Sequence, residues 1–69
     1  ISYNLPVSGQ VELVLYNITG QRVAVLVEGV RAAGHHSVRL AGDDLSTGVY
    51  LYQLSIPGYR EVRRMLLLK

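Results

Sequence analysis

The chain has 69 residues, 49% of them apolar, no cysteine and a formal net charge of +2 at pH 7. This length allows one domain, and the lack of cysteine excludes disulfides and thiolate metal sites. The charge excess is too small to indicate a nucleic-acid partner, and no apolar run is long enough to cross a membrane. The amino end has no signal-peptide pattern and opens on Ile1 inside an apparent strand. We therefore expect residues 1–69 to be a piece cut from a longer protein.

Short alternating apolar and polar segments, separated by turn residues, recur along the whole chain. They predict strands over residues 1–5, 11–16, 21–27, 35–40, 49–56 and 59–68. Turns or loops are expected over 6–10, 17–20, 28–34 and 41–48, and Pro57-Gly58 predicts a tight hairpin. We expect structural turn glycines at Gly20, Gly34 and Gly48, with positive φ at Gly20 and Gly48. The pattern predicts an all-β fold, an Ig-like antiparallel β-sandwich of about seven short strands.

Both faces of the last two predicted strands carry bulky apolar residues. Residues 49–54 place Tyr50 and Tyr52 on one face and Val49 and Leu51 on the other, and residues 62–68 show the same pattern. An isolated sandwich needs only one apolar face per sheet. For any single residue the simpler interpretation is an exposed apolar side chain. For the two strands together we expect an outer face covered by a host domain or a second copy.

Candidate catalytic or metal-binding groups do not combine into a site. His35 and His36 are adjacent, so on a strand they point to opposite faces and cannot readily share a metal. Asp43 and Asp44 lack the spacing of a calcium loop and are better explained as turn residues. Ser46 and Thr47 have no nucleophile-elbow context. We predict no catalysis, no metal and no cofactor, although a metal at Asp43-Asp44 stays open.

The residues near the end of the chain carry the strongest functional signal. Arg60, Arg63, Arg64 and Lys69 form a basic cluster there. The cluster is explained equally well as a solvated, charge-guarded edge or as an electrostatic address for a receptor.

Several motifs together resemble a known family. They are Tyr-x-x-x-Gly-x-x-Val at residues 16–23, Ala-Gly-His-His at 33–36, Gly-Val-Tyr-Leu-Tyr at 48–52 and a basic, apolar end finishing in Lys. Together they cover nearly the whole chain and resemble the C-terminal sorting domain of proteins exported by the type IX secretion system. The chain is also similar to the Ig-like domain of the flagellar hook-capping protein. Two departures are the missing Asn-Pro-rich segment before residues 1–5 and the Arg63-Arg64 pair where lysine is common.

The resemblance implies a non-catalytic secretion signal that directs an N-terminal cargo domain through the periplasm and across the outer membrane to the cell surface. The implied partners are the outer-membrane translocon and a sortase-like peptidase, with no nucleic acid. The residues that match the terminal signal motif are Arg63, Arg64, Met65, Leu66, Leu67, Leu68 and Lys69. Two alternatives stay open: an accessory module that contacts carbohydrate through Tyr50, Tyr52 and Tyr59, and a hook-cap-like assembly scaffold.

Overall fold

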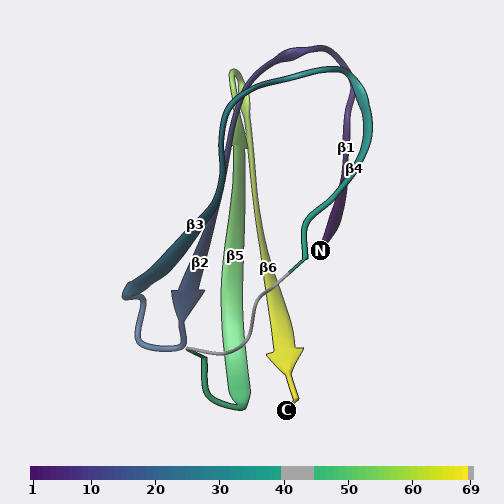
Figure 1. The fold of residues 1–69 in the computed structure, drawn as a ribbon. Helices are drawn as coiled ribbons and strands as arrows, with labels where there is room; N and C mark the ends of the chain where they lie inside the picture. The colour runs from purple at the N-terminus through teal and green to yellow at the C-terminus, as the bar shows by residue number, and fades with distance from the viewer. Residues whose placement is uncertain (40–44, 69) are drawn as a thin grey trace.

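The described residues, 1–39 and 45–68 of a computed structural model, form two antiparallel sheets. The larger sheet has the strand order β3-β2-β5-β6, and the smaller consists of β1 and β4 (Figure 1). The strands are β1 (Ser2–Leu5), β2 (Gly9–Asn17), β3 (Arg22–Arg31), β4 (Gly34–Ser37), β5 (Gly48–Ile56) and β6 (Tyr59–Leu67). The predicted all-β antiparallel sandwich is confirmed, with six strands in the described part of the chain.

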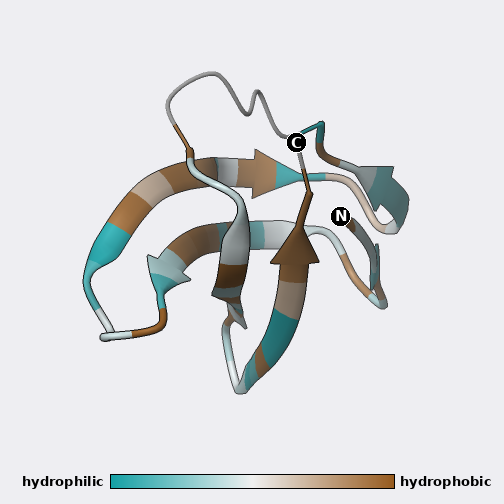
Figure 2. Ribbon diagram, turned by 90° about the horizontal axis from the view of Figure 1, so that it is seen from below, coloured by the Kyte–Doolittle hydropathy of each residue, from teal (hydrophilic) through white to brown (hydrophobic). Residues whose placement is uncertain are grey.

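The core lies between the two sheets and is built on the central strands. Val11, Leu13 and Leu15 of β2 are at most 1% exposed, because β2 is flanked by β3 and β5 and alternates its side chains. Tyr3 and Leu5 of β1 close the core from the smaller sheet. Seen from below, the strands of the larger sheet curve around this core, and hydrophobic residues concentrate within the strands (Figure 2).

The predicted loop over residues 28–34 is wrong for its first half, because β3 continues to Arg31. Glu28 pairs with Glu12, Gly29 with Val11 and Val30 with Gln10. The long partner strand β2 offers a full ladder here, and Gly29 adopts a φ of 126° that a residue with a side chain would avoid. The continuous ladder therefore outweighs the local turn signal.

The turn between β2 and β3 is organised by Asn17. Its Oδ1 accepts hydrogen bonds from the backbone N–H of Thr19 and Gln21, at 3.1 and 2.9 Å, and from the Thr19 hydroxyl at 2.7 Å. Gly20 completes the turn with a φ of 88°, so the positive φ predicted there is confirmed. The motif at residues 16–23 is therefore a structural turn signal.

Two further predictions are corrected. Gly48 does not have a positive φ: it lies inside β5, paired with Leu67, with open space where a side chain would project. The fourth predicted strand, residues 35–40, is shorter, because β4 is Gly34–Ser37 and its pairing with the amino end finishes at Val38. Gly34 opens this strand with a φ of 124°. Asp43, Asp44 and Leu40 lie outside the described residues.

Candidate functional site: the C-terminal strand and the groove beside it

Strand β6 forms one edge of the larger sheet and pairs only with β5 among the described strands. The two strands are joined by the predicted Pro57-Gly58 hairpin, with Ile56 paired to Tyr59. Its position leaves one row of backbone N–H and C=O groups without a strand partner. The last strand is therefore an accessible edge of the fold.

The residues that match the terminal signal motif are divided between two faces. Arg63, Met65 and Leu67 share the inner face with the core, because they pair with Tyr52, Tyr50 and Gly48. Arg64 and Leu66 point to the outer face, where Leu66 is 61% exposed. Leu68 is 73% exposed beyond the end of β6, and Lys69 lies outside the described residues. Arg63 thus lies on the inner face of the sheet, whereas Arg64 lies on the outer face.

Arg63 forms an ion pair with Glu61, the neighbouring residue on its face of β6. The hydrogen bond to Glu61 and its negative charge raise the pKa of the Arg63 guanidinium. Because the folded pKa is raised, this contribution to stability is complete below the unfolded pKa and is lost only in strong base. Arg63 therefore stays charged at every working pH, and the exposed pair adds little to stability.

The outer face of the larger sheet, which we call the outer sheet face, carries exposed apolar side chains on three strands. The exposed fractions are 44% for Val25, 36% for Val49, 55% for Val62 and 61% for Leu66. Val14, which pairs with Val25 and Gln53, points to this face but is only 3% exposed. The expected apolar outer face exists, and no described strand packs on it.

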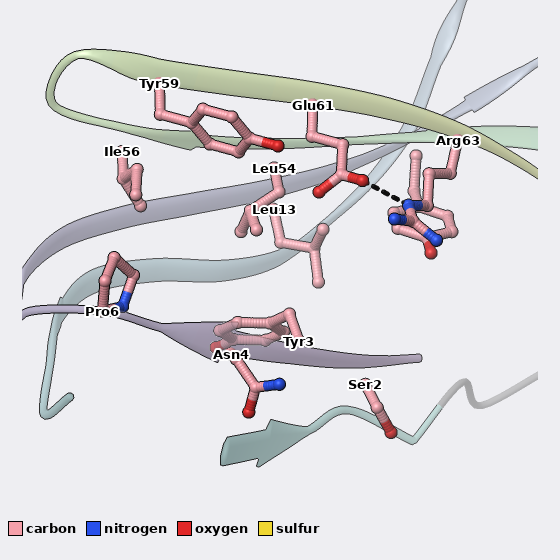
Figure 3. A pocket seen from close by; sticks show the side chains of 11 residues that line it. Ser2, Tyr3, Asn4, Pro6, Leu13, Leu54, Ile56, Tyr59, Glu61 and Arg63 are labelled. Carbon is pink, nitrogen blue, oxygen red and sulfur yellow. Dashed lines mark hydrogen bonds and ion pairs between the residues drawn. The ribbon is translucent and has the colours of Figure 1, made fainter. Parts of the chain in front are cut away.

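A groove of about 440 Å³ lies between β1 and β6, and we call it the β1–β6 groove (Figure 3). Its floor is apolar and includes Leu13, Leu54 and Ile56. One wall belongs to β1 and Pro6, and the opposite wall belongs to β6. The residues that line it are Ser2, Tyr3, Asn4, Pro6, Leu13, Tyr52, Leu54, Ile56, Tyr59, Glu61 and Arg63.

The tyrosines proposed for carbohydrate contact do not act together. Tyr50 is 6% exposed and does not line the groove, whereas Tyr52 and Tyr59 do. Tyr3, which the sequence did not single out, lies in the groove wall and stacks on His36 with ring centroids 5.3 Å apart. The aromatic lining therefore comes from three strands.

The two histidines serve the smaller sheet. His36 Nε2 donates to the Ala32 carbonyl at 2.7 Å while its ring packs on Tyr3 at the core edge, and exposed His35 hydrogen-bonds Asn4 on the opposite face. The prediction that the two histidines point to opposite faces is confirmed. No group of three or more potential metal ligands occurs within residues 1–39 and 45–68. The same residues include no helix with the length and hydrophobicity needed to cross a membrane.

Comparison with known proteins finds no matching family model, no matching curated protein and no matching solved structure. The likeness to sorting domains therefore rests on the motifs of the sequence alone.

Proposed function

We propose that this domain is a non-catalytic C-terminal secretion signal, which directs an attached cargo domain across the outer membrane to the cell surface. The observation that carries the proposal is the exposure of β6, an edge strand with arginine and leucine side chains on its outer face. Arg60, Arg64 and Leu66 are all exposed there, beside a row of backbone groups with which no described strand pairs. A receptor can therefore contact charge, apolar side chains and backbone of the same strand.

The arrangement supports recognition of a folded domain. Residues 63–67 are already ordered within β6 by pairing with residues 48–52 of β5. A receptor that reads this strand meets fixed side chains, so it does not bear the entropic cost of ordering a flexible tail. The implied partners are the outer-membrane translocon and its sortase-like peptidase.

The test is export of a fluorescent cargo fused ahead of residues 1–69 in a host that carries the secretion system. We expect Arg63→Gln, Arg64→Gln and Lys69→Gln together to leave the domain folded and the cargo in the periplasm. The matched control changes Arg22, Arg31 and Arg39 to Gln. It removes the same charge from exposed positions elsewhere in the fold.

The two variants separate a local address from a general charge effect. The proposal is supported if the cargo reaches the cell surface with the control variant but stays in the periplasm with the terminal variant. Normal export of the terminal variant, or equal retention of both, contradicts charge recognition at β6. Deletion of residues 67–69 then tests the strand itself, since it removes the Leu67–Gly48 pair. Normal export by the deletion as well would reject the sorting role.

The alternative function, an accessory or carbohydrate-binding module, is favoured by one observation. Tyr52 and Tyr59 line the β1–β6 groove together with Glu61 and Arg63. Binding of soluble oligosaccharides, lost in Tyr59→Ala, would support it over the sorting role.

The outer sheet face provides a second contact within the proposed function. We propose that it packs on a second copy of the domain, with the cargo domain as the alternative occupant. The exposed Val25, Val62 and Leu66 side chains support this contact.

A further inference from the structure

The edge of β1 that faces away from β4 has no strand partner in the described part of the chain. Ile1 and Val38 exchange two hydrogen bonds, of 3.0 and 2.7 Å, so these residues face one another in the ladder. Antiparallel ladders alternate between hydrogen-bonded and non-hydrogen-bonded pairs. Tyr3 therefore bonds to His36, while the backbone N–H and C=O groups of Ser2 and Asn4 point to the opposite edge.

This opposite edge is a wall of the β1–β6 groove. Ser2 and Asn4 line the groove, yet their side chains point away from it (Figure 3). The Ser2 hydroxyl lies 3.4 Å from that of Ser37, and the Asn4 amide oxygen lies 3.1 Å from His35 Nδ1, both on the far face of the smaller sheet. What Ser2 and Asn4 present to the groove is thus backbone hydrogen-bonding capacity.

The rest of the groove matches the apolar face of an added strand. The smaller sheet has two strands and the larger sheet four, and side chains of β5 and β6 line the groove. Tyr59 is 54% exposed here, and Ile56 is half-buried beside the fully buried Leu13. A strand laid along β1 would point alternate side chains onto this floor.

We propose that the β1–β6 groove binds an extended peptide of another protein, added as a third strand to the free edge of β1, with alternating apolar side chains and an acidic character. Main-chain hydrogen bonds to Ser2 and Asn4 supply affinity, and the apolar floor supplies selectivity. This role goes beyond export, since the main-chain contacts come from β1 and the partner is a different one.

The acidic preference follows from the charges along β6. Of the charged side chains of this strand, Glu61 and Arg63 line the groove and pair with one another, whereas Arg60 and Arg64 lie on the outer face of the sheet. Within residues 1–39 and 45–68, Arg60 and Arg64 have no ion pair. Arg60 and Arg64 do not contact a peptide in the groove, so their positive potential acts on its approach: it favours acidic segments and disfavours basic ones.

A carbohydrate is the weaker candidate for this groove. The Ser2 and Asn4 side chains, which could bond sugar hydroxyls, are turned away and engaged with β4. The charged side chains that remain, Glu61 and Arg63, are paired with one another. The free backbone edge is the feature that a peptide uses and a sugar does not.

The probe is an array of hexapeptides in which Val or Leu alternates with Glu or Thr, and the control peptides have the same composition with the apolar residues in one block. We expect residues 1–69 to bind the alternating set selectively. Amide hydrogen exchange, followed by NMR with bound peptide, should slow at Ser2 and Asn4. Tyr3 and Leu5, already bonded to β4, should change little.

Matched variants test the backbone contact. Asn4→Pro removes the N–H that faces the groove and leaves the ladder to β4 intact, so affinity should fall at least about fivefold. Asn4→Ala loses the contact to His35 but keeps that N–H, so it should bind within about twofold of the original chain. Tyr59→Ala should weaken binding, whereas Val30→Ala, at an exposed position on β3, should not.

Four results would overturn the proposal. They are equal binding of alternating and block peptides, unchanged exchange at Ser2 and Asn4, unchanged affinity of Asn4→Pro, and slowed exchange only on the outer sheet face. Absence of any binding by the alternating set overturns it equally. Slowed exchange with soluble oligosaccharides in place of peptides would assign the groove to carbohydrate.

Discussion

The hydroxyl of Tyr50 donates a hydrogen bond of 2.7 Å to the carbonyl oxygen of Ser46, four residues earlier in the chain. The Tyr50 side chain is 6% exposed, so its ring adds to the buried apolar surface while its polar end is satisfied at the start of β5. Ig-like sandwiches use a similar tyrosine, whose hydroxyl bonds the backbone a few residues upstream. The contact fixes where the chain enters the sheet.

Tyr50→Phe should lower the free energy of unfolding by about 0.5–1.5 kcal/mol, because one hydrogen bond is lost and the ring stays buried. Chemical denaturation, with an unchanged slope against denaturant, measures this loss. Tyr59→Phe is the control, since Tyr59 is 54% exposed and should be neutral. Equal losses in both variants would contradict a specific role for the Tyr50 hydroxyl.

Asn17→Ala should lower the free energy of unfolding by about 1–2 kcal/mol, because one oxygen accepts three hydrogen bonds in the β2–β3 turn. Asn17→Asp keeps that acceptor and loses only the bond from Nδ2 to Gln21, so it should recover most of the loss. Thermal unfolding of the pair measures the difference. Similar unfolding of Asn17→Ala and the original chain would show that the turn is held by its backbone alone.

Glycine substitutions should separate backbone conformation from position in the sequence. Gly58 has a φ of 81° in the hairpin turn, so Gly58→Ala should cost about 1–2 kcal/mol. Gly48 has an ordinary strand conformation and open space around its Cβ position, so Gly48→Ala should change stability by less than about 0.5 kcal/mol or raise it. Urea denaturation measures the free energy of unfolding of both variants. A loss of stability in Gly48→Ala as large as that in Gly58→Ala would contradict the strand conformation of Gly48.

The sequence predicted the hairpin of β5 and β6 closely, because both strands alternate and Pro57-Gly58 lies between them. It failed at Glu28 and Gly29, where the glycine gave a turn signal, because their strand conformation depends on the distant ladder to Val11 and Glu12. Gly48 failed for the same reason, since its pairing with Leu67 decides its conformation. Local chemistry determines turns, whereas long-range pairing determines where strands end.

The two candidate sites also differ in how far the sequence predicts them. The exposure of Val62 and Leu66 was predictable, because alternation in β6 assigns them to the face opposite Met65. The β1–β6 groove was not, since its walls come from opposite ends of the described chain. No spacing in the sequence places Asn4 opposite Glu61; that depends on how the smaller sheet packs on the larger.

The outer sheet face should mediate weak self-association, which its rows of paired residues make self-complementary. One row across the sheet holds Glu28, Glu12, Ser55 and Arg60, and the next holds Val25, Val14, Gln53 and Val62. A second copy related by a twofold axis parallel to the strands would place its β3 over β6. Glu28 of each copy would then meet Arg60 of the other, and Val25 would meet Val62.

Sedimentation at increasing concentration measures this association. Arg60→Glu should weaken it severalfold through like-charge repulsion, and the double variant Arg60→Glu with Glu28→Arg should restore it, because the swapped pair is again complementary. Val62→Lys should abolish it, whereas Val7→Lys, at a residue 69% exposed between β1 and β2, should have no effect. Sedimentation of a single species at all concentrations would argue against a second copy on the outer sheet face, and so would failure of the Arg60→Glu, Glu28→Arg double variant to restore association. The cargo domain would then be the proposed occupant of this face. That assignment requires Val62→Lys to lower the unfolding temperature of a cargo fusion more than that of residues 1–69 alone.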